Sequence, residues 1–213
     1  MSTETHSRDE MVLLARSLFE RGLTPGSSGN LSVRLEDGGF LMTPTNASFG
    51  FLDPARLSRL DADGNWQDGD KPTKEAFLHL AMYRANPDTR SVSHLHSTYS
   101  VCLSCLQDTN PEDLIAPLTP YLQMRVGRVA LAPYRRPGDE SLGPEIEKLA
   151  ARYNGIVIAN HGPVVAGRSL RDSVFSMEEL EESARLNFLL REHSVNRLNR
   201  EQVEELHAHS LNK

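Results

Sequence analysis

Apolar and polar residues follow two different periods along this chain. Between Asp9 and Gly22, apolar residues at 11, 14, 15, 18 and 19 recur with helical spacing, which predicts an amphipathic first helix. Two short strands, Leu31–Leu35 and Phe40–Thr43, then flank a turn-forming Asp37 and two glycines. This second pattern predicts a β-hairpin directly after the first helix.

The rest of the chain alternates short apolar stretches with longer helical patterns. Further helices are predicted over about 74–85, 98–106 and 139–153, and Ser169 is expected to cap a long helix to about 192, with a short one after it. Strands are expected at 57–60, around Trp66, and at 91–96, 129–132, 155–160 and 164–165. The order predicts an α/β fold in α/β/α layers, with a central, largely antiparallel sheet.

Length and composition narrow this picture. The 213 residues, 38% of them hydrophobic, fit one domain over 1–213 with a substantial core, and no second domain is expected. A polar, acidic amino terminus and the lack of an 18-residue apolar run predict neither a secretory signal nor a membrane span, and hence a cytoplasmic protein. A net charge of -6 without a basic run argues against nucleic acid as a partner.

Three histidines carry the strongest chemical signal. His94 and His96 close one apolar stretch, and His161 follows another. In a strand over 91–96 the first two side chains would project to the same side, about 7 Å apart. Three imidazoles that leave a fourth position open are typical of a catalytic zinc site. Taken alone, a His-x-His pair at a strand end is more often an exposed surface pair than a metal site. A single histidine such as His161 is more often a buried, hydrogen-bonded core residue than a ligand.

Two other features are interpreted as structural. Cys102 and Cys105 form a Cys-x-x-Cys, which suits a redox pair or half of a zinc site, but their apolar flanks favour packing in a helix interior. The acidic run over 178–182 is interpreted as the solvated face of the last long helix, without a chemical role.

Three segments before the histidines suit a phosphate group. Ser27-Ser28-Gly29-Asn30 offers backbone amides, Thr43-Pro44-Thr45-Asn46 offers hydroxyls, and Pro72-Thr73-Lys74 adds a cation at a helix start. Each segment alone is most simply a turn or a surface charge. Glu75, in the first turn of the same helix, either stabilises the helix end or moves a proton next to a metal-bound carbonyl.

In order and spacing, five motifs of the chain resemble the class II aldolase and sugar-phosphate epimerase family, typified by fuculose-phosphate aldolase. They are Gly-Ser-Ser-Gly-Asn-Leu-Ser-Val-Arg, Thr-Pro-Thr, Lys-Pro-Thr-Lys-Glu, His-Leu-His-Ser and Ala-Asn-His-Gly. The resemblance implies one Zn²⁺ per subunit at His94, His96 and His161, with Glu75 as the catalytic acid/base and in some states a further ligand. It also implies phosphate contacts at Gly29, Asn30, Thr45, Asn46, Thr73 and Lys74, and a homotetramer with active sites at subunit interfaces. Tyr121 falls where the aldolases carry a catalytic tyrosine that acts across that interface.

The departures from the aldolase pattern point to one branch of the family. The aldolases have glycine after Thr-Pro-Thr and two serines before the catalytic Glu, whereas this chain has Asn46, Thr73 and Lys74. Three segments carry a narrower resemblance: Thr-Pro-Thr-Asn-Ala-Ser-x-Gly-Phe-Leu-Asp-Pro, Gly-Asp-Lys-Pro-Thr-Lys-Glu and Thr-Pro-Tyr-x-x-Met-Arg-Val-Gly. They resemble the 3-oxo-tetronate 4-phosphate decarboxylases, which act in the breakdown of four-carbon sugar acids. The resemblance therefore implies a zinc-dependent carboxy-lyase with a small phosphorylated sugar-acid substrate.

The chemistry and its rivals follow from the same residues. Loss of carbon dioxide from a carboxylate β to a ketone leaves an enediolate, whose charge a metal ion stabilises and which Glu75 would protonate to give dihydroxyacetone phosphate. Retro-aldol cleavage passes through the same species, so an aldolase or a pentulose-phosphate 4-epimerase is the alternative enzyme. A structural module like the adducin head is the non-enzyme alternative. Arg125, Arg135 and Arg136 are candidates for the substrate carboxylate, with a surface role as the alternative for each.

Overall fold

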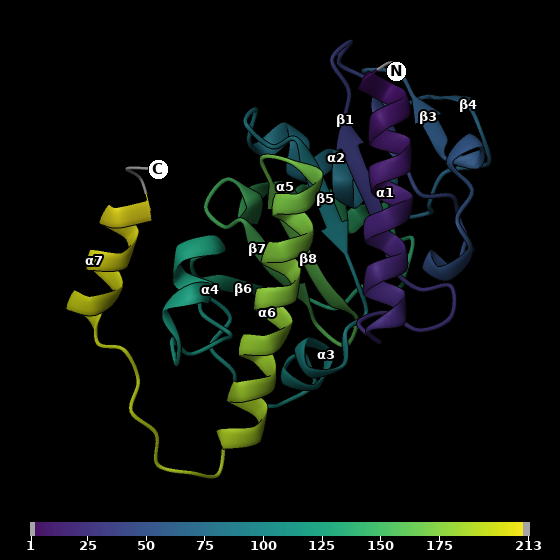
Figure 1. Ribbon diagram of the computed structural model, residues 1–213. Coiled ribbons are helices and arrows are strands. Elements are labelled where there is room, and N and C mark those ends of the chain that lie inside the picture. Colours follow the sequence, from purple (N-terminus) through teal and green to yellow (C-terminus); the bar gives the residue numbers. More distant parts are fainter. Residues whose placement is uncertain (1–2, 211–213) are drawn as a thin grey trace.

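One mixed sheet organises the protein, seen here in a computed structural model that describes residues 3–210 (Figure 1). Its eight strands lie in the order β4-β3-β2-β1-β5-β8-β7-β6, and every neighbouring pair is antiparallel except β6 and β7. The strands are β1 (Asn30–Arg34), β2 (Phe40–Met42), β3 (Ser58–Leu60), β4 (Trp66–Asp68), β5 (Ser91–His94), β6 (Val129–Ala132), β7 (Gly155–Ile158) and β8 (Gly162–Gly167).

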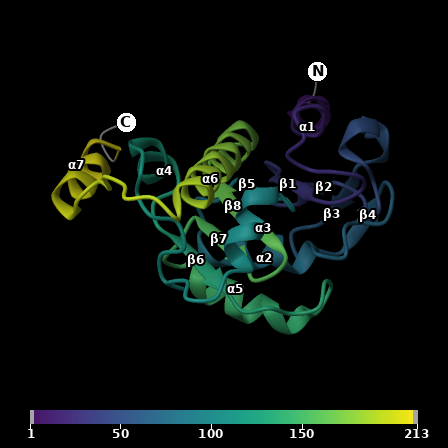
Figure 2. The same ribbon diagram turned by 90° about the horizontal axis from the view of Figure 1, so that it is seen from below.

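Helices cover both faces of the sheet (Figures 1 and 2). One face carries α1 and α6, with α3 and α4 packed against α6, while α2 and α5 pack together on the other face. The helices are α1 (Thr3–Glu20), α2 (Ala76–Ala85), α3 (Thr98–Ser104), α4 (Pro120–Arg125), α5 (Gly143–Ala150), α6 (Leu170–Leu190) and α7 (Arg200–Ser210), and the short 3-10 turns are η1 (Phe49–Phe51), η2 (Pro54–Arg56) and η3 (Glu140–Leu142). The predicted α/β/α layering around a largely antiparallel sheet is confirmed.

Each face of the sheet has its own apolar core. Leu31, Val157 and Val165 belong to the cluster under α1 and α6, whereas Val92 and Ile156 belong to the cluster under α2 and α5. Neighbouring residues of one strand therefore serve opposite layers, because side chains alternate along a strand. The same alternation decides which polar side chains of β1 and β5 face α2.

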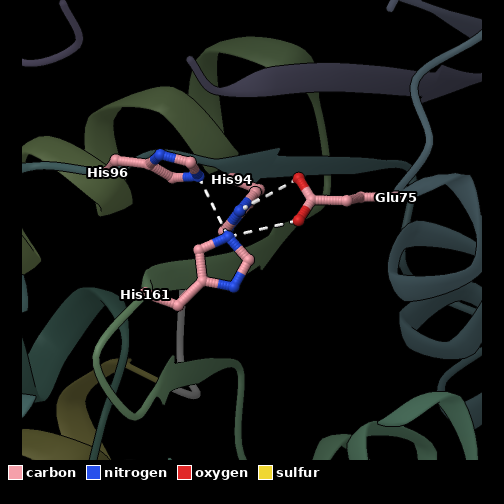
Figure 3. A group of neighbouring side chains, drawn as sticks. All are labelled: Glu75, His94, His96 and His161. Carbon is pink, nitrogen blue, oxygen red and sulfur yellow. Dashed lines mark hydrogen bonds and ion pairs between the residues drawn. The ribbon is translucent and has the colours of Figure 1, made fainter. Parts of the chain in front are cut away.

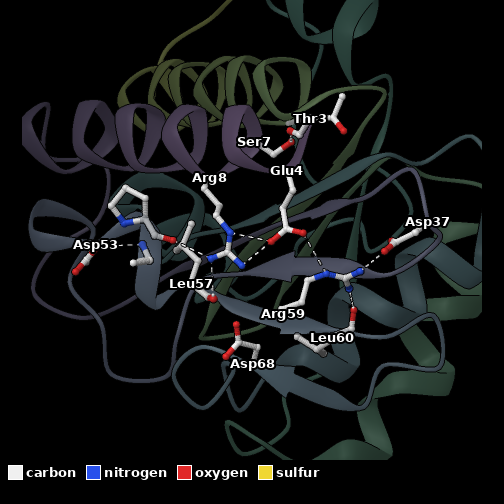
Figure 4. Close-up of polar contacts among 12 residues, drawn as sticks. Thr3, Glu4, Ser7, Arg8, Asp37, Asp53, Leu57, Arg59, Leu60 and Asp68 are labelled. Atoms are coloured by element: carbon white, nitrogen blue, oxygen red, sulfur yellow. Dashed lines mark hydrogen bonds and ion pairs between the residues drawn. The ribbon is translucent and has the colours of Figure 1, made fainter. Parts of the chain in front are cut away.

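The first helix is fixed to the far edge of the sheet by charged groups (Figure 4). The Arg8 guanidinium donates to Glu4 Oε1 at 2.6 Å and 2.9 Å and to the Pro54 carbonyl at 2.8 Å. Arg59 pairs with Asp37 and lies 3.6 Å from Glu4 Oε2. These contacts tie α1 to the η2 and β3 region, far from the histidines.

Several boundaries differ from those predicted. The strand at 91–96 ends at His94, and the helix predicted over about 139–153 is divided into η3 and α5. Helix α4 was not predicted, because its six residues are too few to show a helical period. Ser169 does cap α6, since its hydroxyl accepts from the Asp172 amide at 3.1 Å. No helix in the described range combines the length and the apolar character that crossing a membrane requires.

Candidate metal centre

The three predicted histidines and the predicted carboxylate converge on one point (Figure 3). One potential ligand atom from each of Glu75, His94, His96 and His161 lies within 4.8 Å of the other three. His161 Nε2 is 3.0 Å from His96 Nε2 and 3.2 Å from Glu75 Oε1, while His94 Nε2 is 3.4 Å from Glu75 Oε2. The fold therefore brings together residues that are up to 86 positions apart in sequence, counted from Glu75 to His161.

The residues reach this point from four places in the fold. Glu75 is the N-cap residue of α2, His94 is the last residue of β5, and His161 lies in the tight turn between β7 and β8. His96 lies beyond the strand, in the short loop that leads to the Ser97 N-cap of α3. The prediction that His94 and His96 project to the same side of one strand is therefore wrong in its strand geometry, because β5 ends at His94, although both rings do converge.

The donor set fits a cation. His94 is fully buried, and its Nδ1 lies 2.8 Å from the Pro163 carbonyl, which can only accept, so this nitrogen carries the proton. The Nε2 lone pair then faces the cluster, where it has no hydrogen-bond partner among the described residues. A buried acceptor without a partner is costly. A metal ion bound by the ring nitrogens would satisfy it, and the bond to Pro163 O is the kind of support that metal-ligating histidines usually have.

Charge is tightly coupled within the cluster. Burial alone would raise the pKa of Glu75, but the charges of His94 and His161 and their hydrogen bonds outweigh it and lower that pKa. Burial, together with the charges of the other two histidines, lowers the pKa of His96 to about 4. Against the effect of burial, the Glu75 carboxylate in turn raises the pKa of His94. The arrangement therefore favours an ionised carboxylate and a neutral His96, and at His94 a metal ion would compete with a proton for the same Nε2 atom.

The first predicted phosphate segment lies against β5, the strand that ends at His94. Asn30 pairs with His94 across β1 and β5. Gly29 has a φ of +82°, and a Cβ at that position would come within 3.1 Å of the His94 carbonyl oxygen. A side chain there would be strained both by its backbone conformation and by its neighbours. Glycine at 29 is therefore what allows this segment to approach the histidines.

The other two phosphate segments border Glu75. A β-bridge joins Pro44 to Pro72, and Thr45 N–H donates to the Lys71 carbonyl at 2.9 Å. Thr73 Oγ1 accepts from the Glu75 amide at 3.2 Å, which holds the start of α2. Asn46 and Lys74 are exposed, so both remain free to approach a ligand. These two segments are thus joined just before Glu75, and the contact of all three segments with phosphate stays a prediction.

The side chain of Asn30 already has partners within the protein. Its Nδ2 donates to Glu75 Oε2 at 3.0 Å, and its Oδ1 lies 2.5 Å from His79 Nε2. His79 did not stand out in the sequence, where it reads as one more residue of an apolar helix. A usable signal existed in the four-residue spacing of Glu75, His79 and Tyr83, which places all three on one side of α2.

Glu181 is a second residue that the sequence pattern did not reveal, and its interpretation as part of a solvated face is wrong. The carboxylate is buried, and it accepts from the amides of Tyr99 and Ser100 at 2.7 Å and 2.9 Å and from Ser100 Oγ at 2.6 Å. It therefore caps α3 just after His96. The signal was its place between the core residues Leu180 and Ala184 of α6.

Replacing Glu181 by alanine is expected to lower the free energy of unfolding by about 2–4 kcal/mol, because the buried Ser100 amide and the partly buried Tyr99 amide lose a charged acceptor. Chemical denaturation of the purified protein measures this. The neighbouring Glu182 is exposed, and its ion-pair partner among the described residues is Arg185 at 3.4 Å, so Glu182→Ala should change stability by less than about 0.5 kcal/mol. Equal losses in the two variants would contradict a capping role for Glu181.

The other end of α3 touches the His161 turn. Asn160 adopts a left-handed conformation with φ 55°, its amide donates to Ser104 Oγ at 3.0 Å, and its side chain lies 3.3 Å from Cys105 Sγ. Cys105 is exposed and Cys102 is only half-buried, so the prediction that both pack in a helix interior is wrong. Helix α3 thus braces both loops that carry His96 and His161.

Tyr121 and the candidate arginines lie outside the cluster. Tyr121 is on α4 with 60% of its surface exposed, and no described contact joins it to the histidines. Arg135 is engaged with Glu145 at 2.6 Å. Arg125 and Arg136 are exposed. Within one chain, therefore, the structure does not bring these four predicted residues to the metal centre.

Comparisons with known proteins identify relatives along nearly the whole chain. Residues 9–188 match the family model described as Class II Aldolase and Adducin N-terminal domain. The chain is 49% identical to the 3-oxo-tetronate 4-phosphate decarboxylase of Escherichia coli over 205 residues, which cover 96% of this chain and 97% of the relative. The protein of the same name from Pectobacterium atrosepticum is 48% identical over 206 residues, which cover 97% of this chain and 94% of the relative. The crystal structure of YgbL from Escherichia coli superposes with a TM-score of 0.95 at 48% identity and covers 97% of this chain and 100% of that one.

Proposed function

The chain belongs to the Class II Aldolase and Adducin N-terminal domain family, and from this membership we propose that it decarboxylates 3-oxo-tetronate 4-phosphate to dihydroxyacetone phosphate and carbon dioxide. The observation that carries the proposal is the near full-length identity of 48–49% to relatives with that activity in their names. The intact group of Glu75, His94, His96 and His161 supports a catalytic role for this chain. Four-carbon sugar-acid breakdown is the corresponding metabolic setting.

Zn²⁺ is the proposed cofactor, one ion per subunit, held by His94, His96 and His161. Three imidazoles with an open further position match the preference of a catalytic zinc ion, and Glu75 lies close enough to take part in the resting state. When bound, such an ion acts as a Lewis acid that polarises the substrate ketone and stabilises negative charge on its oxygen. The protein fixes the tautomer of His94, buries the site and supplies Glu75 as the proton carrier.

Glu75 is the proposed proton carrier. The C1–C2 bond of the substrate breaks, carbon dioxide leaves with C1, and the electron pair spreads over C2 and the C3 carbonyl oxygen. A proton must then reach C2 to give the product. The Glu75 carboxylate accepts a hydrogen bond from the Asn30 side chain, and the Glu75 backbone amide donates one to Thr73 Oγ1. These two bonds fix the position from which Glu75 delivers that proton.

The phosphate pocket yields a direct test. If the segments at Gly29, Thr45 and Thr73, with Lys74, bind the substrate phosphate, the unphosphorylated oxo acid loses several charge-assisted hydrogen bonds. Its kcat/KM is expected to be lower by on the order of 10³ or more, at 1.5–3 kcal/mol for each lost charged bond. Steady-state kinetics with the two substrates measure this, and equal specificity constants would contradict the pocket.

Assembly forms a further part of the proposal. We expect a homotetramer whose active sites are completed at subunit interfaces, because the exposed Tyr121 reaches no site within its own chain. The whole chain would act as one class II aldolase-like domain, and we retain the cytoplasmic location inferred from the sequence. Sedimentation of the purified protein tests the oligomeric state.

The decisive experiment measures carbon dioxide release from D- and L-configured 3-oxo-tetronate 4-phosphate. Release from either compound supports the proposal. Release of an aldehyde from a phosphorylated hydroxyketone, or its epimerisation at C4, without carbon dioxide from the oxo acids would instead assign the alternative enzymes. A purified protein that binds no divalent metal and turns over none of these compounds would support the adducin-head-like alternative, against which the intact donor set argues.

A further inference from the structure

A buried chain of five polar side chains extends from the metal centre into the protein. Glu75, His79 and Tyr83 follow at four-residue intervals along one side of α2, opposite Asn30 and Ser32 of β1. Four helical residues rise about 6 Å, and two strand residues about 6.6 Å. The two rows therefore interleave, with one residue of β1 between each successive pair from α2.

Every step of this chain is a short contact. Asn30 Nδ2 lies 3.0 Å from Glu75 Oε2, and Asn30 Oδ1 lies 2.5 Å from His79 Nε2. Ser32 Oγ lies 2.7 Å from both His79 Nδ1 and the Tyr83 hydroxyl. Ser32 and His79 are 0% exposed, and Tyr83 is 2% exposed. Bulk water therefore cannot replace a missing partner.

The donors of the chain can point in only one direction. An ionised Glu75 only accepts, so the Asn30 amide must turn its NH2 group toward Glu75 and its oxygen toward His79. That oxygen also only accepts, so the proton of a neutral His79 must be on Nε2. His79 Nδ1 then accepts from Ser32, whose oxygen is left to accept from Tyr83. Burial lowers the pKa of His79 to about 3 and raises that of Tyr83 well above its usual value, which keeps both neutral.

We propose that His79 is a positioning residue for Glu75: its Nε2 proton locks the Asn30 amide in the one orientation that donates to the catalytic carboxylate. Without that proton, the Asn30 amide is free to rotate and to present its oxygen to Glu75, which repels the carboxylate. Ser32 and Tyr83 support the same tautomer from behind. The inference rests on the proposed acid/base role of Glu75 and adds the device that orients it.

His79→Leu and His79→Gln, each with metal bound, test the proposal. Leucine removes the donor, so kcat for carbon dioxide release should fall on the order of 10–100-fold, the usual cost of losing an outer partner, while KM changes less than about threefold. Glutamine places an amide N–H near the former Nε2 and should recover most of kcat. Tyr83→Phe, four contacts away from Glu75, should lose less than His79→Leu.

Leu78→Ala is the matched control, because Leu78 is the fully buried neighbour of His79 on α2 but takes no part in the polar chain. It should lower stability without the selective loss of kcat. The proposal is overturned if His79→Leu keeps kcat within twofold of the unchanged protein. It is equally overturned if glutamine recovers nothing relative to leucine, or if Leu78→Ala loses as much kcat as His79→Leu.

Crystal structures of the metal-loaded variants give a readout that needs no substrate. The Glu75 carboxylate should move from its present position in His79→Leu and return to it in His79→Gln. If the unchanged protein releases no carbon dioxide but this displacement is seen, the proposed function fails and the positioning role stands. If carbon dioxide is released and Glu75 does not move, the positioning role fails alone.

Discussion

Replacing His94, His96 or His161 by alanine is expected to remove the bound metal and, with it, all measurable carbon dioxide release. Each substitution deletes one of three ring nitrogens that meet at the centre, and a site with three protein ligands has none to spare. Elemental analysis of the purified variants gives metal per chain, and the decarboxylation assay gives activity. Circular dichroism should show that the fold is largely retained, because the rings lie at loop and strand ends and not within the two apolar cores.

His193 provides the control for this experiment. It is exposed in the segment between α6 and α7 and is not part of the cluster, so His193→Ala should keep full metal content and activity. The ligand assignment is wrong for any of the three histidines whose alanine variant retains a full equivalent of metal. Removal of the metal by a chelator should reproduce the inactive state in the unchanged protein, and added Zn²⁺ should reverse it.

Changing Glu75 to glutamine is expected to lower the rate of decarboxylation by on the order of 10²–10⁴, the usual span for a lost acid/base. Glutamine keeps the size of the side chain but cannot carry the proton to C2. Tyr121→Phe should cost clearly less, because carbon dioxide leaves without needing a proton, whereas a departing aldehyde oxygen needs one. Carbon dioxide release from 3-oxo-tetronate 4-phosphate is the readout for both variants.

Two measurements show whether any loss of activity in Tyr121→Phe comes from lost metal or from lost assembly. Metal content should stay near that of the unchanged protein in Tyr121→Phe, since Tyr121 lies outside the donor set. Sedimentation should show whether the variant still assembles. A Tyr121→Phe protein as inactive as Glu75→Gln would assign Tyr121 an essential proton, or, if the assembly is lost, a structural role at the subunit interface.

The layered arrangement explains why a short α3 matters to the site. The Glu181 carboxylate of α6 accepts hydrogen bonds from amides at the amino-terminal end of α3. At the carboxyl-terminal end, Ser104 Oγ accepts a hydrogen bond from the Asn160 amide. His96 precedes the helix and His161 follows Asn160, so both loops depend on the same brace. A metal centre built from loop residues gains its rigidity from such contacts, because loops have no ladder of hydrogen bonds of their own.

Local patterns in the sequence determined most of the elements and the identity of the donor set. Helical spacing in α1 and α6, the strand patterns of β1, β2 and β6, and the Ser169 cap depend on neighbouring residues, whose effects can be read in order along the chain. The residue types of His94, His96, His161 and Glu75 indicated metal and proton chemistry in the same way. Their order and spacing carried the family resemblance.

Only the tertiary structure decided how these residues meet. It ended β5 at His94 and brought His96 in from a loop, and it turned Glu181 from an apparent surface charge into the cap of α3. It also interleaved α2 with β1, so that His79 stands behind Asn30 and Glu75. Such outcomes depend on which strand pairs with which and on which helix covers them. These are contacts between residues distant in sequence, and the local spacing of apolar and polar residues does not predict them.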